Sequence, residues 1–247
     1  MTDLTGKSVI IISDVHYGMK NRSGSRKFLE FLRERSGVYD CAILLGDIFD
    51  LLYTPLEKRY GINKELLSAL GGFAPEKHFI PGNHDFWGRK ILIDEGYIYH
   101  ERGMGAMYHG KKYFFHHGDG FNPVDIGYIA LKALTQRSFM YGLSLIVPPV
   151  FFLRYVQRIS RTDRFTVHSK EEVAFLEKNS FRLARHYGYD GVILGHSHFP
   201  VFTEKDGMTY MNSGDWIVNF SYIEMKNGAL RLARDNELPD TLLDGGI

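Results

Sequence analysis

The 247-residue sequence predicts an α/β fold in which β-sheets pack face to face with helices on the outside. Two short apolar runs, residues 8–12 and 41–45, have the composition of strands that are buried on both faces. A helical pattern lies between these runs, and short alternating segments fill the C-terminal part of the chain. The hydrophobic content of 44% suffices for one substantial core, so we expect a single domain over residues 1–247.

The N-terminal elements predict a parallel sheet. Residues 8–12 and 41–45 each lead into a carboxylate, and residues 25–35 between them carry apolar side chains at helical spacing. This strand, helix, strand order is the unit from which parallel sheets are built. Residues 77–81 predict a third strand.

Later segments predict further strands and an antiparallel end to the fold. Residues 112–116 and 191–194 read as strands that each end in a His-containing turn. After Pro200 the pattern changes to short alternating segments separated by Gly-containing turns, at residues 201–203, 208–211, 217–224 and 229–232.

Residues 122–170 differ from the rest and predict an inserted helical cap. Within them, residues 138–153 form a run of sixteen without a charge, interrupted by Gly142 and by Pro148-Pro149. A spanning helix needs about 20 apolar residues, so the run does not predict a transmembrane segment. Two short helices that break at the prolines fit the pattern better.

The charge distribution singles out the same cap. The formal net charge of the chain is only +1, which gives no electrostatic case for nucleic-acid binding. The cap, in contrast, holds seven basic and two acidic residues. Apolar bulk beside an arginine row fits a surface that meets anionic lipid, or a cavity for acyl chains. The alternative is a helical hairpin with its own core and solvated arginines.

Two further features bear on location. The single cysteine, Cys41, lies in an apolar run and has no partner for a disulfide, so we expect a buried, inert thiol. The N-terminal apolar run is too short for a signal peptide and leads directly into charged residues. A cytoplasmic protein is the resulting expectation.

Five short polar motifs follow the predicted strands. Loops beyond the carboxyl ends of strands in an open α/β sheet converge on one crevice, so these motifs can meet in space. They are Asp14-Val-His16, Gly46-Asp47-Ile-Phe-Asp50, Gly82-Asn83-His84-Asp85, His117-Gly118-Asp119 and Gly195-His196-Ser-His198.

Together the motifs predict a site for two divalent metal ions. Carboxylate oxygens and imidazole nitrogens suit Mn²⁺, Fe²⁺ or Zn²⁺ better than Ca²⁺. One carboxylate must bridge two ions roughly 3.5 to 4 Å apart, and Asp47, at a glycine turn, is the natural candidate. Each motif alone occurs in ordinary loops, but the five in this order indicate a metal centre.

The motif series resembles the calcineurin-like metallophosphoesterase superfamily over nearly the whole chain. The resemblance implies an α/β/β/α sandwich that holds two metal ions, most probable as Mn²⁺ with Fe²⁺, Zn²⁺ and Mg²⁺ as alternatives. It assigns the first metal to Asp14, His16, Asp47 and His198. It assigns the second to Asp47, Asn83, His117 and His196.

The same resemblance suggests the catalytic groups. Two bound cations lower the pKa of a water and neutralise charge on the phosphoryl oxygens, so no protein nucleophile is needed. In related enzymes the His that follows the metal-binding Asn contacts the phosphate and assists the leaving group. We therefore expect His84 to act as a general acid or transition-state stabiliser, with Asp85 as its orienting partner.

Within the superfamily, the cap, the arginine row and residues 212–216 resemble the UDP-2,3-diacylglucosamine pyrophosphatases of lipid A synthesis. Those enzymes attack the α-phosphorus and release UMP and 2,3-diacylglucosamine 1-phosphate. The resemblance implies a lipid-linked sugar nucleotide as substrate and a peripheral position on the inner face of the inner membrane. The expected substrate contacts are Asn83, His84, Asp125, Arg154, Arg158 and Arg161.

One residue departs from that group and keeps alternatives open. Its best-known members carry Arg where this chain has His84, and a His can transfer a proton whereas an Arg cannot. A related phosphodiesterase acting on another lipid-linked or nucleotide substrate is the first alternative. A non-catalytic scaffold is the second, although the sequence lacks none of the expected ligands.

Overall fold

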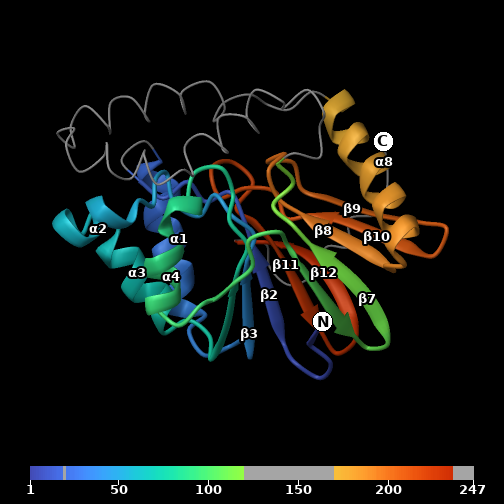
Figure 1. The fold of residues 1–247 in the computed structure, drawn as a ribbon, viewed down its shortest axis with the longest axis horizontal. Coiled ribbons are helices and arrows are strands. Elements are labelled where there is room, and N and C mark those ends of the chain that lie inside the picture. The colour runs from blue at the N-terminus through green and yellow to red at the C-terminus, as the bar shows by residue number, and fades with distance from the viewer. Residues whose placement is uncertain (19–20, 120–169, 236–247) are drawn as a thin grey trace.

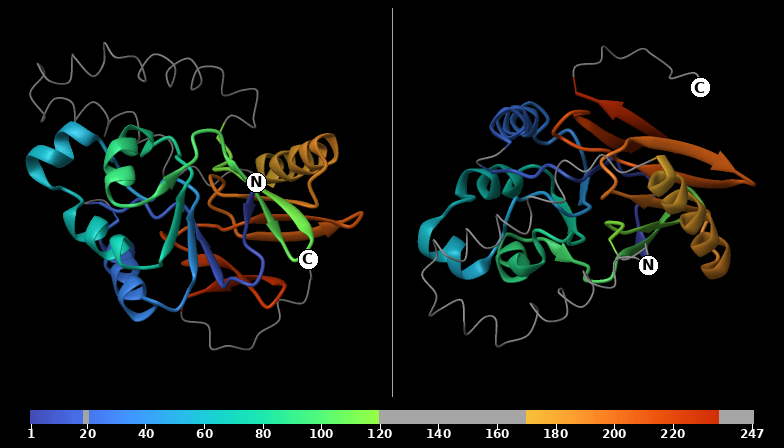
Figure 2. Two further views of the ribbon diagram at one scale, coloured as in Figure 1. Left: turned by 60° about the horizontal axis from the view of Figure 1, so that its bottom comes forward. Right: turned by 90° about the horizontal axis from the view of Figure 1, so that it is seen from above.

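The computed structural model describes residues 1–18, 21–119 and 170–235. Two six-stranded sheets pack face to face, with helices covering the outer face of each (Figures 1 and 2). The predicted layered α/β/β/α architecture is therefore confirmed. The predicted cap lies outside the described residues apart from its last residue, Lys170, and so do four of the expected substrate contacts, namely Asp125, Arg154, Arg158 and Arg161.

One sheet is mainly parallel and contains the first predicted strands. Its strand order is β12-β11-β2-β3-β4-β5, with β2 to β5 parallel and with β11 antiparallel to both β2 and β12. The strands are β2 (Val9–Ile12), β3 (Cys41–Leu44), β4 (Glu76–Phe79), β5 (Ile98–Tyr99), β11 (Ser221–Lys226) and β12 (Ala229–Arg234).

The other sheet is mixed. Its order is β1-β6-β7-β8-β10-β9, and its central strands β7, β8 and β10 run parallel to one another. Strands β6 and β7, and likewise β9 and β10, form antiparallel pairs. The strands are β1 (Thr2–Asp3), β6 (Met104–Tyr108), β7 (Lys111–Phe115), β8 (Gly191–Leu194), β9 (Val201–Lys205) and β10 (Met208–Asn212).

Helices flank the two sheets unequally (Figure 1). Among the described residues, α8 packs on β8 and β10, whereas the N-terminal helices pack on the parallel sheet. The helices are α1 (Arg22–Glu34), α2 (Thr54–Tyr60), α3 (Lys64–Gly71), α4 (Arg89–Asp94) and α8 (Lys170–Tyr187), with a short 3-10 helix, η1 (Phe86–Gly88), before α4.

Strand β2 shows why the apolar runs are continuous. Ile10 and Ile12 face the helices, and Val9 and Ile11 face the second sheet. All four side chains are fully buried, because successive residues of a strand point to opposite faces and both faces are covered. The sequence interpretation of buried parallel strands is confirmed.

One predicted strand begins later than expected. Residues 217–220 form a turn, and β11 starts at Ser221. The carboxylate of Asp215 accepts hydrogen bonds from the backbone N–H groups of three residues of this turn, which satisfies donors that a strand would otherwise pair. The antiparallel pairs β9–β10 and β11–β12 that follow Pro200 are confirmed.

In the described part of the chain, no helix combines the length and the apolar content that crossing a membrane requires.

Candidate metal centre

The structure brings the motif residues to one end of the two sheets. Asp14 and His16 follow β2, Asp47 follows β3 and Asn83 follows β4. From the second sheet, His117 follows β7, and both His196 and His198 follow β8. Because these strands are parallel within each sheet, their carboxyl ends lie at the same edge.

The main chain bends sharply at these residues. Asp14, His16, Asp47, His196 and His198 all have left-handed backbone conformations, with φ between 46° and 69°. Such angles are uncommon for residues other than glycine, although Asp and His tolerate them better than most. Each costs about 1 to 3 kcal/mol and persists only where the surroundings enforce it. The bends lie in the turns that follow β2, β3 and β8, which carry the candidate ligands.

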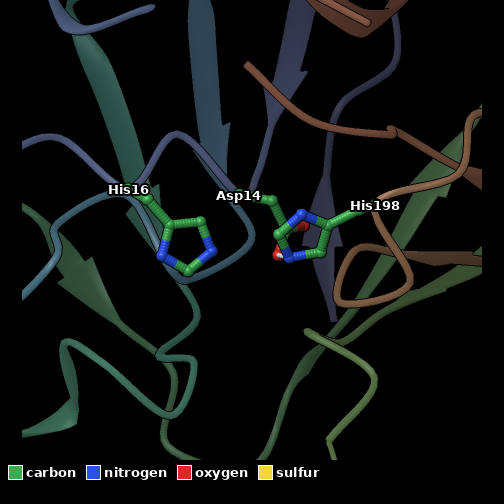
Figure 3. Close-up of side chains that lie close together, drawn as sticks. All are labelled: Asp14, His16 and His198. Carbon is green, nitrogen blue, oxygen red and sulfur yellow. Dashed lines mark ion pairs between the residues drawn. The ribbon is translucent and has the colours of Figure 1, made fainter. Parts of the chain in front are cut away.

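Asp14, His16 and His198 form the first group of candidate ligands. One ligand atom from each residue lies within 4.8 Å of the others. The Asp14 carboxylate lies beside the His198 ring (Figure 3), and His198 Nε2 is 3.4 Å from Asp14 Oδ1. The rings of His16 and His198 are 5.1 Å apart. This is the arrangement that the sequence predicts for part of the first metal site.

Asp47 is central to the cluster. Its Oδ2 lies 3.8 Å from His16 Nε2, 3.6 Å from His117 Nε2 and 3.9 Å from His84 Nε2. Its Oδ1 accepts the backbone N–H of His84 at 2.9 Å, which leaves Oδ2 as the oxygen that faces the imidazoles. Asp47 also groups with Asp14 and His117. Its position between the two sets of ligands fits the bridging role predicted for it.

His117, His196 and Asn83 lie on the side expected for a second metal. The rings of His117 and His196 are 5.1 Å apart. His117 Nδ1 donates to the Leu45 carbonyl at 2.6 Å, which directs Nε2 toward Asp47. The neighbouring His116 instead accepts the Gly118 N–H at its Nδ1, as expected if only one of the two histidines faces the metals.

Several buried oxygen and nitrogen atoms of the cluster could coordinate a cation. Asp14 Oδ1, Asn83 Oδ1 and His117 Nε2 are buried and have no hydrogen-bond partner in the part of the chain that the structure describes. Buried polar atoms are normally hydrogen-bonded, and Asp14 and His117 also belong to one close group with Asp47, so their unsatisfied atoms fit a bound cation. Oxygen and nitrogen donors in this combination fit Mn²⁺, Fe²⁺ or Zn²⁺.

Two motif glycines lie so close to the candidate carboxylate ligands that a side chain would not fit. A Cβ atom on Gly82 would overlap Asp47 Oδ1, and one on Gly195 would lie 2.7 Å from Asp14 Oδ2. Both carboxylates accept backbone hydrogen bonds from the same turns, at His84 N and His196 N. Because glycine has no side chain, each turn can approach its carboxylate closely enough to donate these backbone hydrogen bonds.

The electrostatics of the cluster are those of a cation site. Burial raises the pKa of Asp14. Burial also raises the pKa of Asp47, but the facing imidazoles of His84 and His117 outweigh it and hold that pKa well below its usual range. Burial lowers the pKa of His117, yet the Asp47 carboxylate raises it to about 10. Divalent cations would take the place of these shared protons, so metal affinity should fall in acid.

The expected catalytic residues lie at the edge of this cluster. The His84 ring is 4.8 Å from that of His16, and its Nδ1 donates to the Asp50 carbonyl at 3.0 Å. Asp85 accepts instead from the backbone N–H groups of Gly82 and Ile48, both at 2.9 Å. The orienting partner of the His84 ring is thus the Asp50 carbonyl, whereas Asp85 ties together the loops that carry Asn83 and Asp47.

Two groups that orient histidine rings of the cluster were not predicted from the sequence. The carbonyl oxygens of Leu45 and Asp50 fix the rings of His117 and His84. Main-chain atoms leave no signal in the residue types, so sequence reasoning could not have found them. The carboxylate of Asp50 lies 3.9 Å from His16 Nδ1.

A further group of metal-ligating side chains, Cys41, Glu76 and His78, lies at the opposite ends of β3 and β4. Glu76 pairs with Lys7 and with His78 Nε2, and His78 Nδ1 lies 2.9 Å from His100 Nε2. Burial raises the pKa of the Cys41 thiol to about 12. The hydrogen bonds and the neutral thiol explain why these side chains can lie together without a cation. The expectation of a buried Cys41 is confirmed.

Comparison with known proteins agrees with this site. The family model described as calcineurin-like phosphoesterase matches residues 7–200. A protein of Psychromonas ingrahamii named UDP-2,3-diacylglucosamine hydrolase is 24% identical over 90% of this chain and 95% of its own length. A protein of the same name from Photorhabdus laumondii is 26% identical over 79% of this chain and 83% of its own.

Among solved structures, a chain described as an archaeal phosphodiesterase aligns with 92% of this chain and 98% of its own, with a TM-score of 0.49 and 16% identity.

Proposed function

The chain belongs to the calcineurin-like phosphoesterase family and is a metal-dependent hydrolase, and from this premise we propose that it cleaves the pyrophosphate of UDP-2,3-diacylglucosamine. Water adds to the α-phosphorus, the bond from that phosphorus to the bridging oxygen breaks, and UMP and 2,3-diacylglucosamine 1-phosphate leave. The observation that carries the proposal is the buried group of Asp14, Asp47 and His117, which each offer a ligand atom within 4.8 Å of the others.

The candidate ligands form two sets that share Asp47. Asp14, His16, Asp47 and His198 would hold the first metal, and Asp47, Asn83, His117 and His196 would hold the second. When bound, two divalent cations, with Mn²⁺ the first choice, supply the Lewis acidity that activates water and offsets phosphoryl charge.

In this proposal His84 and Asn83 contact the phosphate. With Nδ1 donating to Asp50, His84 presents Nε2 to the cluster. When the ring carries a proton on both nitrogens, the proton on Nε2 can be donated to a phosphoryl oxygen as charge builds on it.

The substrate class rests on two supports. Relatives that span most of this chain carry the name UDP-2,3-diacylglucosamine hydrolase. Residues 138–153 lack charge and are followed by Arg154, Arg158 and Arg161. We assign the apolar run to the acyl chains and the arginines, with Asp125, to the polar head, which would place the protein peripherally on the cytoplasmic face of the inner membrane.

The test is direct. Purified protein incubated with Mn²⁺ and UDP-2,3-diacylglucosamine should release UMP. Asp47→Asn is the matched negative control, because Asn tolerates the left-handed backbone at this position while one oxygen becomes a nitrogen that cannot bridge metals. Turnover that persists in this variant would refute the bridging role of Asp47.

The departure at His84 supports a second candidate, a phosphodiesterase that acts on another lipid-linked or nucleotide substrate. Cleavage of aryl phosphodiesters or cyclic nucleotides, without UMP release from the diacylated sugar nucleotide, would favour it. A protein that binds metal but cleaves none of these substrates would favour the non-catalytic scaffold.

A further inference from the structure

The segment Asn212-Ser-Gly-Asp-Trp216, which connects β10 to β11, lies against the first-metal loop. The backbone N–H of Trp216 donates to the Asp14 carbonyl at 3.1 Å. The hydroxyl of Ser213 lies 2.6 Å from that of Ser13. These contacts join the segment to the residue pair that ends β2, so it is in a position to influence the first-metal ligands.

Within this segment, Asp215 is buried and its two oxygens have different partners. Oδ1 accepts the backbone N–H groups of Ile217, Val218 and Asn219 at 3.0, 2.8 and 2.9 Å. Oδ2 faces His198 Nδ1 at 3.7 Å, within ion-pair distance and just beyond a hydrogen bond. One oxygen therefore holds the turn, and the other approaches a candidate metal ligand.

The His198 ring lies between two carboxylates. Its Nε2 is 3.4 Å from Asp14 Oδ1, and its Nδ1 faces Asp215. The side-chain amide of Asn219 donates to the His198 carbonyl at 3.0 Å and to Asp215 Oδ2 at 3.3 Å. Asn219 thereby fixes the Asp215 carboxylate relative to the main chain of His198.

We propose that Asp215 is a positioning residue that keeps the proton of His198 on Nδ1, so that Nε2 presents its lone pair to the first metal. The proposal rests on the assignment of His198 to that metal. A carboxylate behind an imidazole fixes its tautomer and raises its basicity as a ligand. The corresponding partner of His117 is the neutral carbonyl of Leu45, so the groups behind His198 and His117 differ in charge.

Asp215→Asn separates the two functions of this side chain. Asn keeps a carbonyl oxygen to accept the three backbone N–H groups, but its amide nitrogen cannot accept a proton from His198 Nδ1. Titration with Mn²⁺ followed by calorimetry should show one of two binding events weakened about 10- to 100-fold. The thermal midpoint of the metal-free variant should equal that of the wild type.

A matched control is Asp206→Asn, which removes an exposed carboxylate in the turn between β9 and β10, where Asp206 pairs with Arg185. Both binding events should keep wild-type affinity in this variant. A double-mutant cycle adds a second check: in a His198→Ala background, Asp215→Asn should cause no further loss of Mn²⁺ affinity.

Each outcome bears on the proposal. Unchanged binding of two ions by Asp215→Asn overturns it and leaves the two-metal site intact. A lowered thermal midpoint in the metal-free variant overturns it in favour of a purely structural role. Failure of the wild-type protein to bind Mn²⁺ at all refutes the proposed metal centre, and the role of Asp215 with it.

Discussion

The imidazole of His84 is held in one orientation by its own loop. Nδ1 donates to the Asp50 carbonyl at 3.0 Å, and the backbone N–H donates to Asp47 Oδ1 at 2.9 Å. The remaining ring nitrogen, Nε2, is the atom that faces the cluster, 3.9 Å from Asp47 Oδ2. This fixed orientation fits the proposed contact of His84 with the phosphate of the substrate.

This geometry predicts a loss of turnover without a loss of metal. Replacing His84 by Ala should lower kcat by about 10²- to 10⁴-fold, the usual contribution of a general acid or base. His84→Arg should keep part of the phosphate contact through its charge but should not restore proton transfer. Steady-state kinetics, together with metal content measured on the same samples, checks both variants.

A metal content that falls in parallel with kcat would contradict this role and would make His84 a ligand. Equal kcat in the Ala and Arg variants would instead show that the charge of the side chain contributes nothing.

Helix α1 shows how one side chain joins an element to the site. Asn21 Oδ1 accepts the Gly24 N–H at 3.2 Å, which caps the start of the helix. Its Nδ2 donates to the Val15 carbonyl at 3.0 Å, between the ligands Asp14 and His16. The helix and the first-metal loop are therefore fixed to each other through this amide.

Asn21→Ala should lower the free energy of unfolding by about 0.5 to 2 kcal/mol, the usual loss for an N-cap. Asn21→Asp keeps the capping oxygen and removes only the donor, so its loss should be smaller. Urea unfolding in the presence of a chelator measures both. If the two variants lose the same stability, the cap is not the source of the effect.

The strands that lead to ligands were predictable because each is an apolar run that ends in a motif. Residues 191–194 match β8 completely, and β2 and β3 differ from the predicted runs by one residue each. Strand β6 and helix α8 were not anticipated. In β6 the glycine Gly105 interrupts the pattern of a strand, and α8 follows directly on the predicted cap.

The candidate ligands were predictable from spacing, whereas their support was not. The two-residue separation of Asp14 from His16 is visible in the sequence, whereas their left-handed backbone angles are not. The contact between Asp215 and His198 joins two sequence-distant loops, which meet only because β8 and β10 are neighbours in the sheet. Long-range pairing of this kind is not encoded in any local pattern.

At the scale of the whole molecule, the metal centre joins the two sheets. The parallel sheet supplies Asp14, His16, Asp47 and Asn83, and the mixed sheet supplies His117, His196 and His198. Metal ions bound between them should stabilise the fold, because an unfolded chain does not present these groups together.

Added Mn²⁺ should therefore raise the thermal midpoint, by an amount that grows with concentration. For one ion at a hundredfold excess over its Kd, the added stability is about 2.7 kcal/mol. Differential scanning calorimetry with and without chelator measures it. The shift should shrink in Asp47→Asn and remain in Asp206→Asn; an equal shift in both would place the ions elsewhere.

Because the candidate ligands come from two sheets, the full site can form only when both sheets are assembled. Neither half of the sandwich holds a full ligand set, since the imidazoles that follow β7 and β8 come from one half and the carboxylates that follow β2 and β3 come from the other. A nascent or damaged chain with only one half assembled would have no means of attacking phosphoesters in its surroundings. The hydrolase should therefore become active only when both sheets are in place.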